Sequence, residues 1–235
     1  AATPKKAARP APFTPVLEPR AVELLQAMSQ RLAAAKTLQF TAVAGYEYPS
    51  RLGPPVVYAM RYDVALQRPN QLKIVVPGDG PAFEFGFDGR EMVAYVPAQN
   101  LVAVADAPPT IEGALQKAFD SAAIYFPFTD LLLPDPYGAI SAGAILAYVV
   151  GPSAVVGGVP TDMVVWANND VFLQLWIGTD DHLPRRIRAQ FRADPRGLRH
   201  DLELSQWQLD GTLAADTFST AKDRAGQPMA FAAPG

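Results

Sequence analysis

The sequence predicts a mainly β protein with some helix (α+β): an incomplete antiparallel β-barrel of about 10 to 11 strands, with an N-terminal helix and a short-helix lid. Short segments in which apolar and polar residues alternate fill most of the 235-residue chain, and this period of two is typical of half-buried strands. Turn residues separate the segments roughly every 8 to 12 residues, which is the spacing of a barrel or sandwich. The alternation is absent only near the start and in the middle of the chain.

A helix is expected from Pro19 to about Lys36. Proline suits the first helical position, because the N–H that it lacks would have no partner there. Apolar side chains recur at spacings of three and four, which places them on one helix face. They are Val22, Leu25, Met28 and Leu32.

Residues 1–17 are rich in Ala and Pro, carry basic side chains and show no hydrophobic periodicity. Such a composition predicts a disordered leader, followed by a single open-barrel domain over 18–235. Because the chain starts with Ala rather than Met, we expect that an upstream segment was removed, by a signal peptidase or by design.

The segments expected to be strands form two antiparallel series, separated by a region without strand character. Tight turns such as Asp88-Gly89 and Asn168-Asn169-Asp170 join several of them. The expected strands are 37–46, 56–64, 71–76, 82–87, 91–96, 101–105, 144–150, 159–167, 170–177, 185–192 and 201–209.

A lid is expected at about 108–137, between the two series. Thr110 after two prolines suits a helix N-cap, and apolar residues follow it at four-residue spacing. Beyond this helix the segment is very apolar but is divided by Pro127, Pro134 and Pro136, so that neither a strand nor a long helix fits. This pattern indicates short helices that lie across an apolar space.

The composition excludes several kinds of site. The chain has no cysteine, which rules out disulfides, thiolate metal sites and thiol nucleophiles. It has two histidines, His182 and His200, and both lie in expected turns. Ser153 lacks the second glycine of a nucleophile elbow, and no apolar run reaches the about 18 residues of a membrane span. We therefore expect no cofactor, no metal, no enzymatic activity and, at a net charge of −3, no nucleic-acid partner.

Three segments carry a family resemblance: the Arg-Pro-Asn before a strand in "RPNQLKIVV", the Asp-Gly-Arg hairpin and Tyr-Val-Pro strand end in "FGFDGREMVAYVPAQNLVAV", and the hairpin in "VFLQLWIGTDDHLPRRIRAQF". In their order and spacing they resemble the outer-membrane lipoprotein carrier superfamily, the LolA/LolB-like proteins. The resemblance is greatest to uncharacterised predicted periplasmic relatives and covers roughly Pro19 to Phe218.

The resemblance implies a periplasmic protein with an open barrel, a helical lid and a hydrophobic cavity that accepts acyl chains. In the carriers, an arginine inside the barrel holds the closed lid by hydrogen bonds, and the nearest candidate here is Arg68. The side chains expected to contact the ligand are Tyr58, Met60, Phe83, Phe85, Phe87, Tyr95, Phe119, Phe126, Phe128, Leu131 and Trp176.

These apolar residues also have a structural interpretation. Phe83, Phe85 and Phe87 share one strand face, but a face that lines a cavity and a face that packs in a core give the same alternation. Trp176 either borders a pocket or packs with its N–H as a polar handle.

A cluster of arginines lies near residue 190. On a strand, Arg186, Arg188 and Arg192 would share one face, with apolar residues on the other face. This face is either a solvated outer surface or a docking surface for anionic lipid head groups or an acidic partner.

Two functions of different classes follow. The first is a periplasmic carrier or binding protein for an apolar ligand, such as a lipid acyl chain or an acylated peptide. The alternative is an envelope protein–protein interaction module with a solid core and no ligand. The partners expected besides a lipid or acylated peptide are another envelope protein or a membrane surface.

Overall fold

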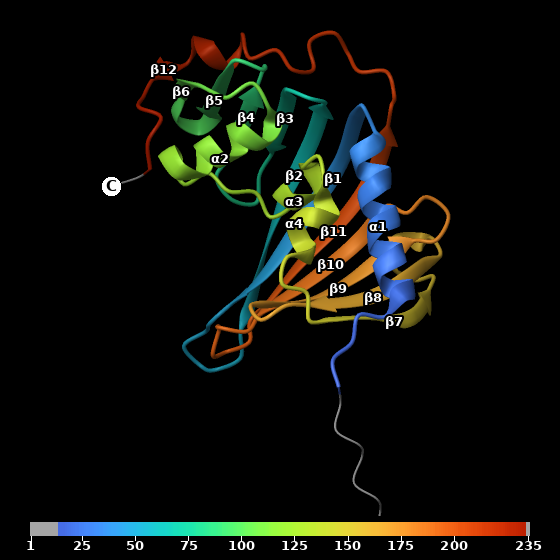
Figure 1. Ribbon diagram of the computed structural model, residues 1–235. Helices are drawn as coiled ribbons and strands as arrows, with labels where there is room; N and C mark the ends of the chain where they lie inside the picture. The colour runs from blue at the N-terminus through green and yellow to red at the C-terminus, as the bar shows by residue number, and fades with distance from the viewer. Residues whose placement is uncertain (1–13, 234–235) are drawn as a thin grey trace, which may run out of the picture.

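The computed structural model describes residues 14–233 and contains one 12-stranded sheet (Figure 1). The spatial order is β12-β6-β5-β4-β3-β2-β1-β11-β10-β9-β8-β7, and every neighbouring pair is antiparallel except β12–β6. The strands are β1 (Thr37–Tyr48), β2 (Val56–Gln67), β3 (Gln71–Val76), β4 (Phe83–Phe87), β5 (Glu91–Val96), β6 (Leu101–Asp106), β7 (Leu146–Ser153), β8 (Thr161–Ala167), β9 (Val171–Gly178), β10 (Pro184–Phe191), β11 (Arg199–Leu209) and β12 (Gln227–Pro228).

The fold class predicted from the sequence is confirmed: the protein is mainly β, and its sheet is curved but not closed (Figure 1). β7 and β12 form the two edges, and the long strands β1 and β2 join the two halves. β3 and β5 have the predicted bounds, while β12 is one strand more than predicted. β12 has two residues, which are too few for an alternation of apolar and polar residues to predict a strand.

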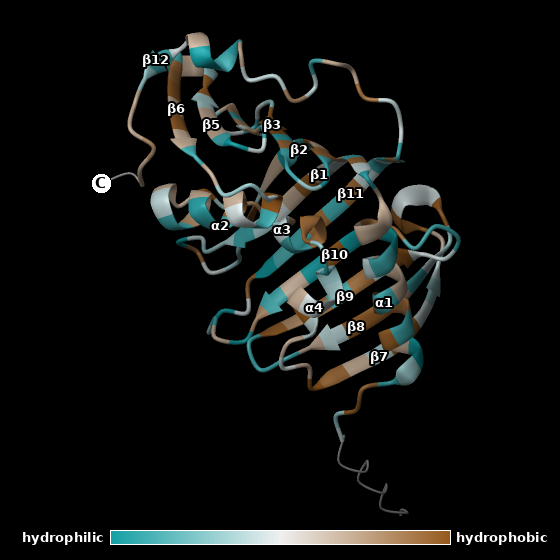
Figure 2. Cartoon of the chain, turned by 45° about the horizontal axis from the view of Figure 1, so that its top comes forward, coloured by the Kyte–Doolittle hydropathy of each residue, from teal (hydrophilic) through white to brown (hydrophobic). Residues whose placement is uncertain are grey.

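Helix α1 (Pro19–Ala34) has Pro19 at its first position and ends two residues before the predicted end. It crosses the sheet over β7 and β8, as the two views of the molecule agree (Figures 1 and 2). Its residues Leu25, Met28 and Leu32 are fully buried between the helix and the sheet. The predicted apolar stripe is therefore the face that packs on the sheet.

The chain before α1 is paired with β7. The Ala147 N–H donates to the Val16 carbonyl at 3.0 Å, and the Ala147 carbonyl accepts from the Glu18 N–H at 2.8 Å. Leu17 forms a parallel bridge with Ala147. The predicted leader boundary at residue 17 therefore falls within a paired segment, and residues 1–13 lie outside the described part of the chain.

Three helices lie between β6 and β7. In α2 (Ile111–Ala122), the Thr110 hydroxyl accepts a hydrogen bond from the Gly113 N–H at 3.1 Å, which is the predicted N-cap. Two short helices follow, α3 (Thr129–Leu132) and α4 (Pro136–Ser141). The insertion thus extends four residues beyond its predicted end at 137. None of the helices in residues 14–233 is long and apolar enough to cross a membrane.

The two halves of the sheet carry different covers. In both views, α2 lies beside β3–β6, whereas α1 and α4 lie over the β7–β10 half (Figures 1 and 2). The α2 half has a dense core in which the β3–β5 side chains and the helix face are in one cluster. The fully buried strand residues there are Leu72, Ile74, Phe85, Phe87 and Met92.

Candidate functional site

A hollow of about 600 Å³ lies between the β8–β11 half of the sheet and the short helices α3 and α4. Its floor consists of alternate residues of neighbouring strands, and its roof comes from Met28 of α1 and from the segment between α2 and the end of α4. The apolar floor residues are Trp166, Val171, Leu173, Leu175, Ile187, Ala189, Phe191 and Leu202. Pro127, Phe128, Leu131, Ala139 and Ile140 form the roof.

The hollow exists because its covering elements are short. α2 has 12 residues and buries Ile111, Ala114, Leu115 and Ala118 over its first two turns, whereas α3 has four residues and α4 has six. Such short helices bring few side chains to the sheet, and a proline precedes or begins each helix, which prevents a longer helix. Side chains of Ala, Val and Leu on the floor do not reach far enough to fill the space.

An aromatic wall, made of Phe40, Tyr62, Phe126 and Phe128, separates this hollow from the dense core. The Phe128 ring lies 5.2 Å from Tyr62 and 5.6 Å from Phe40, both edge to face. Phe126 contacts Phe128 at 5.9 Å on one side and Phe85 of the dense core at 5.6 Å on the other. Edge-to-face and offset aromatic pairs at these distances are favourable. The wall fixes the roof segment before α3 to the middle of the sheet.

Arg68, at the end of β2, connects the roof to α1. Its guanidinium donates to the carbonyl oxygens of Leu32 at 3.1 Å, Ala35 at 3.1 Å and Leu132 at 2.9 Å. Leu32 and Ala35 are at the C-terminal end of α1, where carbonyls lack helical partners and a cation is favourable, and Leu132 is the last residue of α3. Burial lowers the pKa of this guanidinium, which still remains charged. One side chain therefore holds α1, α3 and the sheet together.

The hollow has a polar part, which sequence reasoning missed. Tyr46, Tyr62, Tyr125 and Asp130 line it. Burial raises the pKa of the Asp130 carboxyl, and burial together with the neighbouring Asp130 raises the pKa of the Tyr125 phenol. Asp130 and Tyr125 are both exposed residues at the edge of the hollow. A carboxylate next to aromatic rings thus borders an apolar space.

Of the eleven residues predicted to contact a ligand, Phe128 and Leu131 line the hollow. Phe85 and Phe87 are fully buried in the dense core and Phe126 is in the wall. Phe83 and Met60 are half-buried against the dense core, and the Tyr95 hydroxyl donates to the Asn100 side chain at 3.2 Å. Tyr58 and Phe119 are more than half exposed.

The hollow thus lies between the predicted lid and the second strand series, whereas most strand residues predicted to contact a ligand belong to the first series. The bulky phenylalanines of β4 fill their half completely, and it is the smaller residues of β8–β11 that leave space. Leu173, Leu175, Ile187 and Ala189 were missed as lining residues. Their alternation was visible in the sequence, but the length of the helices above them decides whether such a face meets a core or a hollow.

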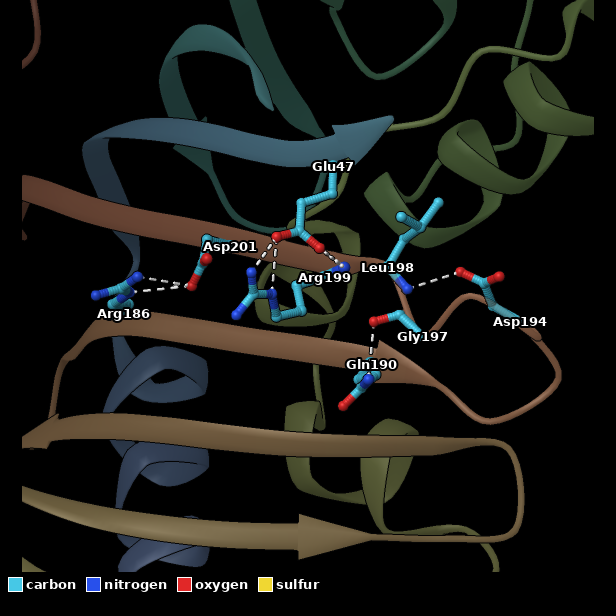
Figure 3. A network of polar contacts seen from close by, with 8 residues as sticks. All are labelled: Glu47, Arg186, Gln190, Asp194, Gly197, Leu198, Arg199 and Asp201. Carbon is cyan, nitrogen blue, oxygen red and sulfur yellow. Dashed lines mark hydrogen bonds and ion pairs between the residues drawn. The ribbon is translucent and has the colours of Figure 1, made fainter. Parts of the chain in front are cut away.

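The predicted division of β10 into an arginine face and an apolar face agrees with the structure, since Ile187, Ala189 and Phe191 line the hollow. Arg186 lies on the opposite face, paired with Asp201 at 2.9 Å (Figure 3). Its guanidinium also lies over the Trp176 ring, 5.3 Å from the ring centroid. Trp176 therefore also lies outside the hollow.

A second ion pair joins Arg199 to Glu47 on the same outer surface (Figure 3). Arg192 donates to the Asn168 carbonyl at 3.4 Å. Within residues 14–233, Arg188 has no carboxylate within ion-pair distance. Of the three arginines predicted to form a docking surface, Arg186 is thus paired with a carboxylate, while Arg188 and Arg192 have no such pair within residues 14–233. The docking surface stays a prediction.

The two histidines lie in different parts of the second strand series. His182 lies in the turn between β9 and β10, whereas His200 of β11 lines the hollow and packs edge-on against Phe191 at 5.3 Å. Within the described residues, no three His, Cys, Asp or Glu side chains are grouped to hold a metal ion.

Solved structures with a similar fold include an uncharacterised conserved protein from Thermus thermophilus, with 12% identity, a TM-score of 0.51, and coverage of 90% of this chain and 99% of that chain. LprF from Mycobacterium bovis has 16% identity and a TM-score of 0.49, and the match covers 86% of this chain and 98% of LprF. A LolA superfamily protein, NE2245 from Nitrosomonas europaea, has 10% identity and a TM-score of 0.39, and the match covers 85% of this chain and 97% of that protein. At these identities the similarity concerns the fold alone.

Among curated proteins, none matches this sequence. A family model does match residues 21–231, which is most of the chain, and its description is "Predicted periplasmic protein (DUF2092)". The resemblance to predicted periplasmic relatives that the sequence indicated is thereby confirmed. The chain belongs to the DUF2092 family of predicted periplasmic proteins.

Proposed function

We propose that this protein is a periplasmic carrier or binding protein, which holds the apolar chain of a lipid or of an acylated peptide in the hollow under α3 and α4. The hollow itself carries this proposal. Its volume of about 600 Å³ lies within the roughly 300–1,000 Å³ of small-molecule sites. The family description supports the periplasmic location.

The free energy of transfer favours such a ligand. Each buried methylene contributes about 0.8 kcal/mol, so that a twelve-carbon chain gains roughly 9 to 10 kcal/mol before the costs of ordering. This affinity suits capture and requires a means of release. The roof supplies one, because α3 and α4 are short and Arg68 holds α3 through a single carbonyl contact.

The alternative function assumed a solid interior, and the hollow in the β8–β11 half does not agree with that assumption. An exposed apolar hairpin tip between β1 and β2 still offers a surface to a partner: Leu52 is 94% exposed and Val57 is 67% exposed. We therefore retain binding of an envelope protein or a membrane surface at this tip as a second role, compatible with ligand binding.

Uptake of a neutral fluorescent apolar probe by the full chain tests the proposal. Ala189→Phe places a ring in the hollow and should abolish most of the uptake, whereas Ala154→Phe, at an exposed position between β7 and β8, should not change it. Mass spectrometry of lipids extracted after gentle purification identifies the natural occupant. If neither probe nor extracted lipid is bound, or if both variants take up the probe as the wild type does, the proposal is wrong.

A further inference from the structure

We propose that the hollow selects amphiphiles whose head group carries a positive charge, such as an alkylammonium, over those with an anionic head group. This inference deepens the proposed function and depends on it, since it specifies the head group of the ligand held there. It rests on the charges and rings that line the hollow.

The lining contains a carboxylate but no Lys or Arg. Across residues 14–233, the residues that border the hollow include Asp130, His200 and Asp201 and no Lys or Arg. The Asp201 side chain lies on the opposite face of the sheet, where it pairs with Arg186 at 2.9 Å. Within the same residues, Asp130 has no hydrogen bond or ion pair. Asp130 therefore represents an uncompensated negative charge, which disfavours a carboxylate or phosphate nearby.

The surroundings of Asp130 increase the effect of its charge. It belongs to the first turn of α3 at the roof, is exposed, and borders a mainly apolar space. Charges beside apolar protein surface interact more strongly than charges in bulk water. An ammonium group whose apolar chain lies in the hollow would therefore be attracted to the Asp130 carboxylate, which has no protein cation as a partner within residues 14–233.

Three tyrosines surround the same part of the hollow. Tyr46 comes from β1, Tyr62 from β2 and Tyr125 from the segment before α3, and all three line the space. Burial raises the pKa of the Tyr62 phenol, and Tyr46 and Tyr125 add to the shift. Tyr62 is buried, whereas Tyr125 is 67% exposed at the edge of the hollow. Aromatic rings attract ammonium groups. A carboxylate with several such rings is typical of sites for ammonium ligands, whereas an anion gains nothing from them.

Competition against a bound neutral probe provides the test. Dodecylammonium, dodecanoate and a neutral dodecyl glycol ether share one chain length, so that differences in displacement report the head group. At about pH 8 both charged heads are ionised, and concentrations are kept below micelle formation. We expect dodecylammonium to compete about tenfold more effectively than dodecanoate, which corresponds to about 1.4 kcal/mol.

Two variants assign the preference to Asp130. Asp130→Asn should reduce the ratio of ammonium to carboxylate competition toward one, and because the ratio is taken within each variant, general changes in affinity cancel. Asp180→Asn, in the exposed turn after β9, should keep the wild-type ratio. Tyr125→Leu, which removes a ring and keeps the apolar bulk, should reduce the ratio by a smaller factor.

The outcomes separate the two proposals. If the probe binds but the three dodecyl compounds compete equally, the charge selection is wrong and the apolar site stands. A preference that survives Asp130→Asn unchanged also overturns the inference. If the probe does not bind, the proposed function fails, and the inference fails with it.

Discussion

The two halves of the sheet have the same alternation of apolar residues but different interiors. Under α2, a helix of 12 residues, the inward-facing β3–β5 residues Leu72, Ile74, Phe85, Phe87 and Met92 are fully buried. Under α3 and α4, the β8–β11 residues face a hollow of about 600 Å³. The strands differ little, so the length and continuity of the covering helix decide whether a sheet face becomes a core or a binding cavity.

The largest expected difference is in stability between matched leucines of the two halves. Leu72 of β3 is fully buried in the dense core, so Leu72→Ala should lower the free energy of unfolding by about 3 to 5 kcal/mol. Leu173 of β9 is half-buried and borders the hollow, so Leu173→Ala should cost only about 1 kcal/mol, because fewer contacts are lost. Urea denaturation of both variants measures this. Equal losses of unfolding free energy in the two variants would mean that Leu173 is packed as tightly as Leu72, so that the hollow is filled in solution.

The second prediction concerns the attachment of the roof. Arg68→Met removes three hydrogen bonds from a charged donor to α1 and α3 and should cost about 2 to 3 kcal/mol. Hydrogen exchange should accelerate over 129–141 and not over 111–122, because α2 is held by the dense core. Arg61→Met is the matched control: Arg61 is exposed and pairs with Asp63 of its own strand, so its loss should cost under about 1 kcal/mol. Uniform acceleration across both regions would contradict the independence of the two covers.

The third prediction adds volume to each half. Ala118 of α2 is fully buried in the dense core, and Ala118→Phe should destabilise by about 1 to 3 kcal/mol through overpacking. Ala189 of β10 borders the hollow, and Ala189→Phe should leave the melting temperature unchanged or raise it. Thermal unfolding of the two variants checks this. A destabilised Ala189→Phe would show that the space is smaller in solution.

Much of the fold could be predicted from the sequence, because its signals are local. The periods of β3 and β5, the proline at the start of α1 and the Thr110 cap all depend on residues within one element. The location of the hollow depends on distances between elements. Whether Phe85 or Leu175 faces empty space is decided by the helix above each, and no alternation along a strand reports that. Arg68 was identified as a candidate through a family resemblance, but its contacts with Leu32 and Leu132 join residues far apart in the chain.

The smallest expected effects are on the pH dependence of stability, and they have opposite signs inside and outside the hollow. Burial raises the pKa of Asp130 above its ordinary value of 3.8, so its ionised form opposes folding at neutral pH. Asp130→Asn should therefore raise the melting temperature at pH 7, by at most about 2 °C. This gain should disappear as the pH falls through the raised pKa of the folded state and below the ordinary value.

Glu47 on the outer surface is the opposite case. The hydrogen bond from Arg199 lowers its pKa below the ordinary value of 4.5, so its ionised form favours folding above that value. Glu47→Gln should therefore lower the melting temperature slightly at pH 7, and the loss should vanish as the pH falls through the lowered pKa of the folded state. Melting curves of both variants between pH 7 and pH 3 test the pair. If Asp130→Asn behaved like Glu47→Gln, the Asp130 carboxylate would have a stabilising partner, and the difference between the charge in the hollow and the charges on the outer surface would be lost.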